Sequence, residues 1–202
     1  MSRLRLAVVV AVGLAIAVAG AAVLLLRGDG EDPALSRMSV TGRPVEMAVP
    51  DNLGRFVGDL TGEVELITQR RDLRFLRLEK ATGGWCYATA DRRFGDWGLT
   101  EYACQTSANP FPSPEIPVIN VGRLVGTRDP ELIEYGQFAG FAADAVHRVG
   151  IIDKNDRVIP VAEVVDNVYY APKPPPGAKR MVALDAEGKV IWRSAGVQRP
   201  EE

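Results

Sequence analysis

Short hydrophobic runs alternate with polar turn clusters along most of the chain. From residue 63 onward these runs are rich in β-branched and aromatic residues, and Gly, Pro, Asp and Asn separate them. Apolar residues at every second position are typical of a strand with one buried face. The one helical alternative, residues 130–135, is short and is followed closely by Gly136 and Gly140. The pattern therefore predicts an all-β domain, an antiparallel β-sandwich or barrel-like fold.

The first half of this domain is predicted to be an antiparallel meander. Its expected strands cover residues 63–69, 73–79, 85–90 and 98–104. The alternation in the second strand breaks at Phe75 and Leu76, which are adjacent and both apolar. We expect a β-bulge there, or burial on both faces of the sheet.

The pattern in the last third of the chain predicts two hairpins with a longer strand between them. Its expected strands cover residues 145–152, 157–161, 164–171, 179–184 and 189–193. Gly188 is well placed for the left-handed residue of the final turn. The strand 164–171 leads into a proline-rich loop at residues 172–177.

The N-terminal run from Leu6 to Leu26 contains 21 residues and no charged side chain. As a helix it would span roughly 30 Å, the thickness of a bilayer's hydrocarbon core. Small residues near Ala19 offer signal-peptidase sites, but the apolar run continues well past them, which favours a retained anchor over a cleaved signal peptide. Arg3 and Arg5 precede the run, so the N-terminus is expected inside and the rest outside.

These features predict a single-pass protein of the cell membrane whose β domain lies outside the cytoplasm. The expected segments are a cytoplasmic n-region 1–5, a transmembrane signal anchor 6–26, a polar tether 27–44, an extracytoplasmic β domain 45–197 and a frayed tail 198–202. The net charge of −2 becomes −4 when Arg3 and Arg5 are left out. An acidic domain argues against nucleic acid as a partner, since phosphate binding needs a basic surface.

The two cysteines, Cys86 and Cys104, flank a turn-rich segment. In an exported domain they are expected to form a disulfide, worth about 3 kcal/mol in the chain-entropy view. The alternative is two unrelated buried thiols. Two cysteines and the single histidine, His147, do not make a metal-ligand set, so no metal or cofactor is expected.

No catalytic signature stands out. His147 shares the predicted apolar face of strand 145–152, so it is either a general base or, as we favour, a core or rim histidine bonded to backbone. The closest carboxylate pairs, Asp153 with Asp156 and Asp185 with Glu187, fall in predicted turns, where Asp commonly caps the backbone. The sequence therefore assigns no catalytic residue, and we lean towards a protein that is not an enzyme.

The most distinctive loop combines stiff prolines with two tyrosines. Its candidate binding residues are Tyr169, Tyr170, Pro172, Pro174, Pro175 and Pro176. Consecutive strand residues point to opposite faces, so one tyrosine is expected inside and the other near the surface. The loop is either a recognition site or a rigid connection between strands.

Basic residues also cluster in the first half of the domain. They are Arg70, Arg71, Arg74, Arg77, Lys80, Arg92 and Arg93. They either meet anionic lipid or wall polymer, or, as we favour because acidic residues intervene, form a solvated strand face.

The segments VVDNVYYAPKPPPG and MVALDAEGKVIW resemble a pattern in exported proteins of actinobacteria that have no assigned activity. In that pattern a cysteine-bearing strand pair, here GGWCYATA and LTEYAC, precedes a proline-rich stretch, here NPFPSPEIPVIN. The resemblance covers residues 63–194 and implies a secreted or anchored β domain.

Together these expectations favour a membrane-tethered binding domain of the cell envelope, with an envelope protein or polymer as partner. Two alternatives stay open. One is an envelope hydrolase whose carboxylates are gathered by the fold, and the other is a structural accessory subunit of a membrane complex.

Overall fold

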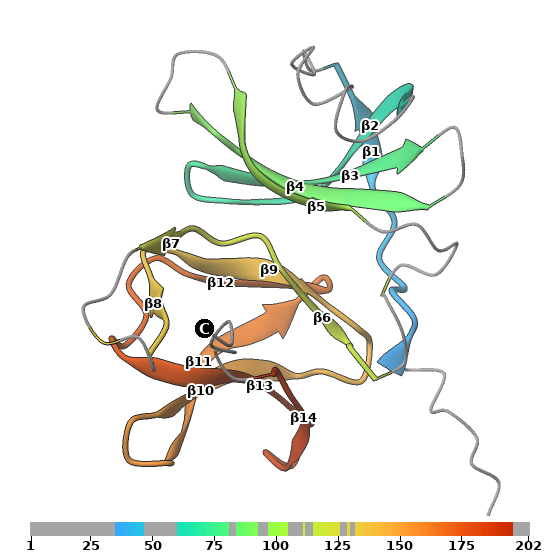
Figure 1. Cartoon of the computed structure of the whole chain (residues 1–202). Helices are drawn as coiled ribbons and strands as arrows, with labels where there is room; N and C mark the ends of the chain where they lie inside the picture. Colours follow the sequence, from blue (N-terminus) through green and yellow to red (C-terminus); the bar gives the residue numbers. More distant parts are fainter. Residues whose placement is uncertain are drawn as a thin grey trace, which may run out of the picture. The chain divides into compact units, whose positions relative to one another are not determined.

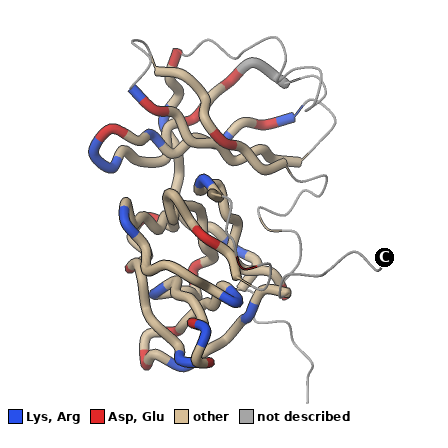
Figure 2. Tube along the Cα trace, turned by 60° about the vertical axis from the view of Figure 1, so that its left-hand side comes forward, with Lys and Arg blue, Asp and Glu red and all other residues tan. Residues whose placement is uncertain are grey.

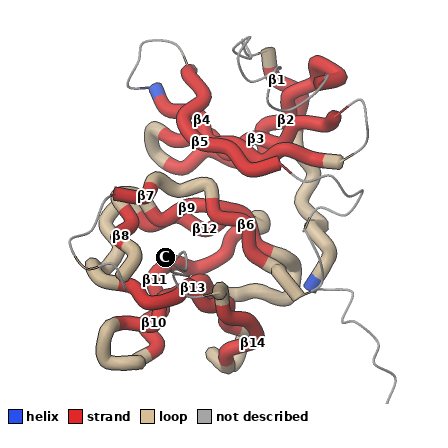
Figure 3. The backbone as a smooth tube through the Cα atoms, in the orientation of Figure 1, coloured by secondary structure: helices blue, strands red, loops and turns tan. Residues whose placement is uncertain are grey.

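The computed structural model describes residues 35–46, 60–80, 84–92, 97–104, 111, 115–125, 129 and 132–195, all within one compact unit, residues 32–202. Strands and loops make up nearly all of this region (Figure 3), and the strand pairs are antiparallel. The predicted all-β class is confirmed. No helix in the described part of the chain is long and apolar enough to cross a membrane. The predicted anchor 6–26 lies outside the described residues.

The first sheet has five strands in the order β1-β2-β3-β4-β5, so each strand pairs with its neighbours in sequence. Their bounds are β1 Arg43–Val45, β2 Leu60–Arg70, β3 Leu73–Lys80, β4 Trp85–Asp91 and β5 Gly98–Cys104. The predicted meander is thus confirmed, with β1 added at one edge. Cys86 and Cys104 lie opposite each other on β4 and β5 and form the predicted disulfide.

The second sheet has seven strands in the order β14-β13-β10-β11-β12-β9-β6 (Figure 1). Their bounds are β6 Val118–Asn120, β9 Phe138–Ala142, β10 Arg148–Asp153, β11 Val158–Val165, β12 Val168–Ala171, β13 Ala178–Leu184 and β14 Val190–Arg193. A two-stranded ribbon, β7 Leu124–Val125 and β8 Glu134–Tyr135, stands beside it.

Strands β10 to β13 of the second sheet form a Greek key. Strands β10, β11 and β12 are joined by hairpins, and β13 returns to pair with the far side of β10. The long return is the proline-rich loop 172–177, so this loop connects strands that are not neighbours. The sheet curls into a half-barrel. Its curvature brings the Tyr169 hydroxyl on β12 to 3.8 Å from the Met181 sulfur on β13.

The hydrophobic core joins the two sheets. The Phe75 ring on β3 meets Phe141 on β9 edge to face, with ring centroids 5.7 Å apart. Tyr87 on β4 lies 4.8 Å from the same Phe141 ring. All three side chains are fully buried. A second, smaller core lies on the other face of the five-stranded sheet and includes Leu76.

The expected irregularity at Phe75 and Leu76 is confirmed. Both side chains are fully buried, one in each of the two cores. The register of β2 against β3 shifts between Leu66 and Thr68, opposite these residues. The extra residue of the bulge is therefore Ile67 on the partner strand, while β3 itself alternates regularly and is buried on both faces by the two cores.

One predicted strand is wrong. Residues 164–171 do not form a continuous strand, because Asp166 and Asn167 make a tight turn between β11 and β12. Both residues have positive φ, 56° and 57°, as a two-residue type I′ hairpin requires. The Asn167 side chain is buried and donates to the Ala142 carbonyl at 3.0 Å, which fixes the turn against β9.

Both predicted C-terminal hairpins are confirmed, and carboxylates hold their turns. Asp153 accepts from the backbone nitrogens of Asn155 and Arg157, each at 2.9 Å. Asp185 accepts from the backbone nitrogen of Lys189 at 2.8 Å, and Gly188 has φ of 84° as expected. These acidic side chains therefore act as turn caps.

The segment just before β1 is bound to the domain rather than being only a polar tether. Asp144 accepts from Arg37 Nε at 2.7 Å and from the Ser39 backbone nitrogen at 2.9 Å. The Val40 backbone nitrogen donates to the Asn167 side chain at 3.0 Å. Met38 is 8% exposed and joins the main core. The ordered domain thus begins before the predicted boundary at residue 45.

Candidate functional site

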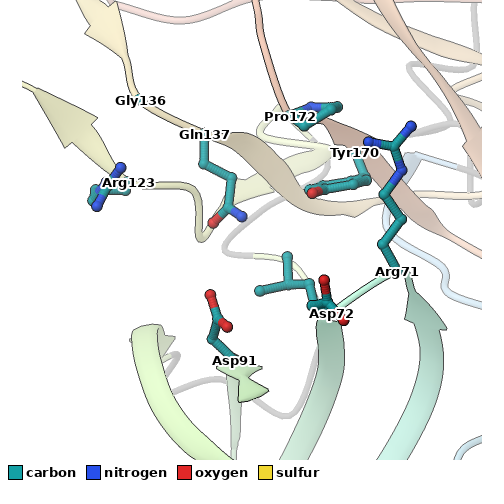
Figure 4. Close-up of a pocket in the computed structure, with 9 residues that line it drawn as sticks. Arg71, Asp72, Asp91, Arg123, Gly136, Gln137, Tyr170 and Pro172 are labelled. Atoms are coloured by element: carbon teal, nitrogen blue, oxygen red, sulfur yellow. The ribbon is translucent and has the colours of Figure 1, made fainter. Parts of the chain in front are cut away.

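A polar cleft of about 330 Å³ lies where turns of the five-stranded sheet face the end of β12 and the β7–β8 ribbon (Figure 4). Its lining residues are Arg71, Asp72, Leu73, Asp91, Arg123, Gly136, Gln137, Tyr170 and Pro172. The cleft contains two residues of the predicted binding loop, Tyr170 and Pro172, together with charged side chains that are distant in sequence.

The five-stranded sheet contributes two carboxylates. Asp72 belongs to the two-residue turn between β2 and β3, in which Arg71 has positive φ of 53°. Asp91 ends β4 and is paired in register with Leu73, the first residue of β3. The Asp91 residue is only 3% exposed, whereas Asp72 is exposed. Adjacent strands thus bring one buried and one exposed carboxylate to the same cleft.

Strand β12 contributes the aromatic wall. Tyr170 is half-buried, and its ring meets Phe75 edge to face with centroids 6.3 Å apart. Its neighbour Tyr169 is fully buried, so the expectation that the two tyrosines point to opposite faces is confirmed. Pro172 follows at the rim. Pro174, Pro175 and Pro176 lie further along the Greek-key connection and are not among the lining residues.

The opposite wall is held together by backbone hydrogen bonds. The Arg123 carbonyl accepts from the backbone nitrogens of Gly136 at 2.8 Å and Gln137 at 3.1 Å. These bonds fix Gln137 beside Arg123. Gln137 and Asp91 reach into the cleft from opposite sides (Figure 4).

A partly buried chain of hydrogen bonds supports that wall. The Tyr169 hydroxyl lies 3.3 Å from Asn120 Oδ1, and the same oxygen accepts from the Gly122 backbone nitrogen at 3.3 Å. A Cβ on Gly122 would meet the carbonyl oxygen of Gln137, so only glycine fits here. Tyr169 therefore acts behind the cleft, while Tyr170 lines it.

The charges of the lining balance. The lining contains two arginines, Arg71 and Arg123, and two carboxylates, Asp72 and Asp91. Acidic and basic residues are likewise interspersed along the whole described chain (Figure 2). The cleft offers hydrogen-bond donors, acceptors and one aromatic ring, which together can bind a polar ligand without a net charge requirement.

His147 lies elsewhere, and the prediction that it shares the apolar face of strand 145–152 is wrong. It precedes β10 and is exposed, although Val149 and Ile151 are fully buried as expected. Its backbone nitrogen donates to the Leu184 carbonyl and its carbonyl accepts from Val164, each at 2.9 Å. It is thus a rim residue tied by its backbone. The described residues contain no cluster of three or more side chains that could hold a metal ion.

Two residues of the basic cluster pack against other side chains, whereas a solvated strand face was expected. The Arg77 guanidinium lies 4.6 Å from the centroid of the Trp85 ring and forms an ion pair with Glu65 at 2.6 Å. The Arg74 guanidinium lies 3.9 Å from the centroid of the Trp97 ring. Alternating strand geometry sends these arginines to opposite faces of β3, so they brace the sheet.

Sequence reasoning missed Arg123, Gln137 and Asp91 as site residues. The first two occupy short, irregular segments around β7 and β8, which no periodic pattern reveals. Asp91 comes directly after the predicted apolar strand 85–90, where the sequence pattern indicates an ordinary turn residue. Comparison of the chain with protein-family profiles, curated proteins and solved structures found no match.

Proposed function

We propose that this protein is a membrane-tethered binding domain of the cell envelope and that the polar cleft is its binding site. One observation carries the proposal. The distinctive loop places Tyr170 and Pro172 in the same cleft as Asp91 and Gln137. A half-buried tyrosine beside stiff backbone gives contact area at low entropic cost, and the polar groups around it supply selectivity.

Two features support the location outside the cytoplasm. The apolar run 6–26 is long enough to anchor the chain. The disulfide between Cys86 and Cys104 suits an oxidising compartment. The packing of the five-stranded sheet against the half-barrel through a shared core supports the classification of the exported domain as a β-sandwich. Intact-mass measurement of membrane-extracted protein should find residues 1–26 retained, and a mature form that begins near Gly20 or Ala22 would contradict the anchor.

Site-specific photo-crosslinking tests the binding site. A photoreactive amino acid at Pro172 in the full-length protein, in its native membrane, should form an adduct. The matched control is the same amino acid at Val158, which is 39% exposed on β11 and does not line the cleft. Adducts from Pro172 alone support the proposal. No adduct, or equal adducts from both positions, would refute it.

A second function has one observation in its favour. The fold brings Asp72 and Asp91 to one cleft, and paired carboxylates perform acid–base hydrolysis in many enzymes. If the protein is an envelope hydrolase, it should release soluble fragments from cell-wall material, and Asp91→Asn should abolish the release. If the protein only binds, wild type and Asp91→Asn should both release nothing. The accessory-subunit alternative predicts a Pro172 adduct with one membrane protein.

A further inference from the structure

We infer that the cleft binds an uncharged segment of a glycan, an inference that rests on the proposed binding function and specifies its ligand. The inference comes from the lining chemistry of the described cleft: its balanced charge, its paired planar polar groups and its fixed tyrosine.

The balance of charge disfavours ionic ligands. A phosphate or carboxylate ligand would gain from Arg71 and Arg123 but would meet Asp91, which is buried in the wall. A basic peptide would face the same two arginines. Like charges placed close together are costly in a partly desolvated site. A neutral ligand meets neither penalty.

The hydrogen-bonding groups suit hydroxyls. A guanidinium offers only donors, an ionised carboxylate only acceptors, and the Gln137 amide offers both. Each sugar hydroxyl can donate and accept, so adjacent hydroxyls can satisfy all three kinds of group at once. The planar two-pronged geometry of these side chains also matches two neighbouring hydroxyls.

Tyr170 supplies the apolar contact that a sugar ring requires. Its ring is fixed against Phe75 from the other sheet, at 6.3 Å between centroids, while the residue stays half-buried. The face of an aromatic ring is electron-rich and attracts the weakly positive C–H groups of a pyranose ring. A peptide ligand would instead need a strand edge or apolar anchor pockets. Among the described residues of the lining, the other apolar ones are Leu73, which is 2% exposed, and Pro172 at the rim.

The dimensions agree with a short oligosaccharide. The volume of about 330 Å³ lies near the lower limit of the roughly 300–1,000 Å³ that small-molecule sites occupy. The cleft therefore fits a short stretch of a chain that continues into solvent.

Saturation-transfer NMR on the full-length protein tests the inference. The protein is held in a detergent without a sugar headgroup, and the probes are maltotriose and N,N′,N″-triacetylchitotriose. We expect saturation transfer to at least one of them, with affinity weakened about tenfold by Tyr170→Ala. Gln137→Ala should weaken binding as well. The control is Tyr102→Ala, which removes a tyrosine that is 43% exposed on β5 and does not line the cleft.

Three results would overturn the inference. They are no transfer from either sugar at a concentration on the order of 10 mM, equal binding by wild type and Tyr170→Ala, and tighter binding of trilysine or triglutamate than of the sugars. The crosslinking at Pro172 separates the two proposals. A protease-sensitive adduct without sugar binding would refute the glycan ligand and leave the binding site standing. Loss of the adduct would refute the site itself.

Discussion

The Tyr169 hydroxyl lies 3.3 Å from Asn120 Oδ1, which links the buried face of β12 to the chain that leads to Arg123. The adjacent Tyr170 lines the cleft from the other face of the same strand. A single Tyr-Tyr pair therefore supports one wall of the site and forms part of another. This arrangement makes the roles of the two tyrosines separable by substitution.

Tyr169→Phe should lower the free energy of unfolding by about 1 kcal/mol, because one buried hydrogen bond is lost. It should also weaken ligand binding by loosening the segment from Asn120 to Arg123. Denaturant unfolding measures the first effect and titration the second. An unchanged unfolding midpoint would show that the contact with Asn120 contributes nothing.

Tyr87→Phe is the matched control, with the opposite expected sign. Among the described residues, the Tyr87 hydroxyl is the buried side-chain polar group without a hydrogen-bond partner. Removal of an unsatisfied buried hydroxyl removes its desolvation cost, so the variant should be as stable as wild type or more stable. A loss of more than about 1 kcal/mol would reveal a partner for this hydroxyl.

Gly122→Ala should destabilise the domain by about 1–3 kcal/mol, since the new Cβ would meet backbone atoms of Gln137 and Ala139. The strain falls on the wall that carries Arg123, so binding should weaken too. Gly98→Ala is the control, because a Cβ there has no neighbour within 4 Å. Thermal unfolding of both variants measures the difference, and equal melting temperatures would contradict the close approach.

A thiol assay under denaturing, non-reducing conditions should find almost no free thiol in protein from the envelope. Reduction should lower the free energy of unfolding by about 3 kcal/mol, because the denatured chain regains its freedom. The bond lies beside the smaller core, in which Cys86 is 1% exposed. Two titratable thiols would refute oxidation in the native compartment.

Acid should release the segment just before β1, residues 37–40, from the rest of the domain. Partial burial raises the pKa of Asp144, but hydrogen bonds from Asn167, Arg37 and Ser39 together lower that pKa below its usual value. Asp144 therefore contributes stability that is fully present above the unfolded-state pKa of about 3.9 and is lost as the pH falls through the lower folded-state pKa.

The difference in unfolding free energy between wild type and Asp144→Asn should accordingly be constant near neutral pH and shrink below about pH 4. At pH 7 it should be about 2 kcal/mol, as for hydrogen bonds to a charged group. Glu187→Gln, in an exposed turn, serves as the pH control. A difference that grows on acidification would refute the role of Asp144.

His147→Gln should leave any binding or hydrolytic activity intact and change stability by less than about 0.5 kcal/mol, because the side chain is exposed and outside the cleft. Activity assays beside circular dichroism test this directly. Lost activity in a folded variant would make His147 part of the chemistry.

The sequence was sufficient for features that depend on local pattern. The period of two revealed the meander and the C-terminal hairpins, and the broken alternation at Phe75 marked the bulge opposite it. The hairpin at Asp166 and Asn167 was missed because its turn lacks glycine, and valines on both sides continue the strand pattern.

The cleft depends on long-range order, which a local pattern does not contain. Arg123 and Gln137 line the same cleft as Asp91 only because the two sheets pack together through one core. The loop with Tyr170 was predictable as a distinctive segment. Its path across the Greek key was not, since strand order follows from tertiary packing.

The polar contacts of the segment before β1 also determine how the domain would respond to a mechanical load. Tension that travels along the chain toward Arg37 would first strain its bonds with Asp144, then the bond from Val40 to Asn167, then the short ladder of β1 with β2. Because these contacts follow one another along the chain, they would rupture in sequence and at low force. The same sequence would withdraw Met38 from the main core, while the disulfide-linked strands β4 and β5 would be shielded until the last of these contacts had parted.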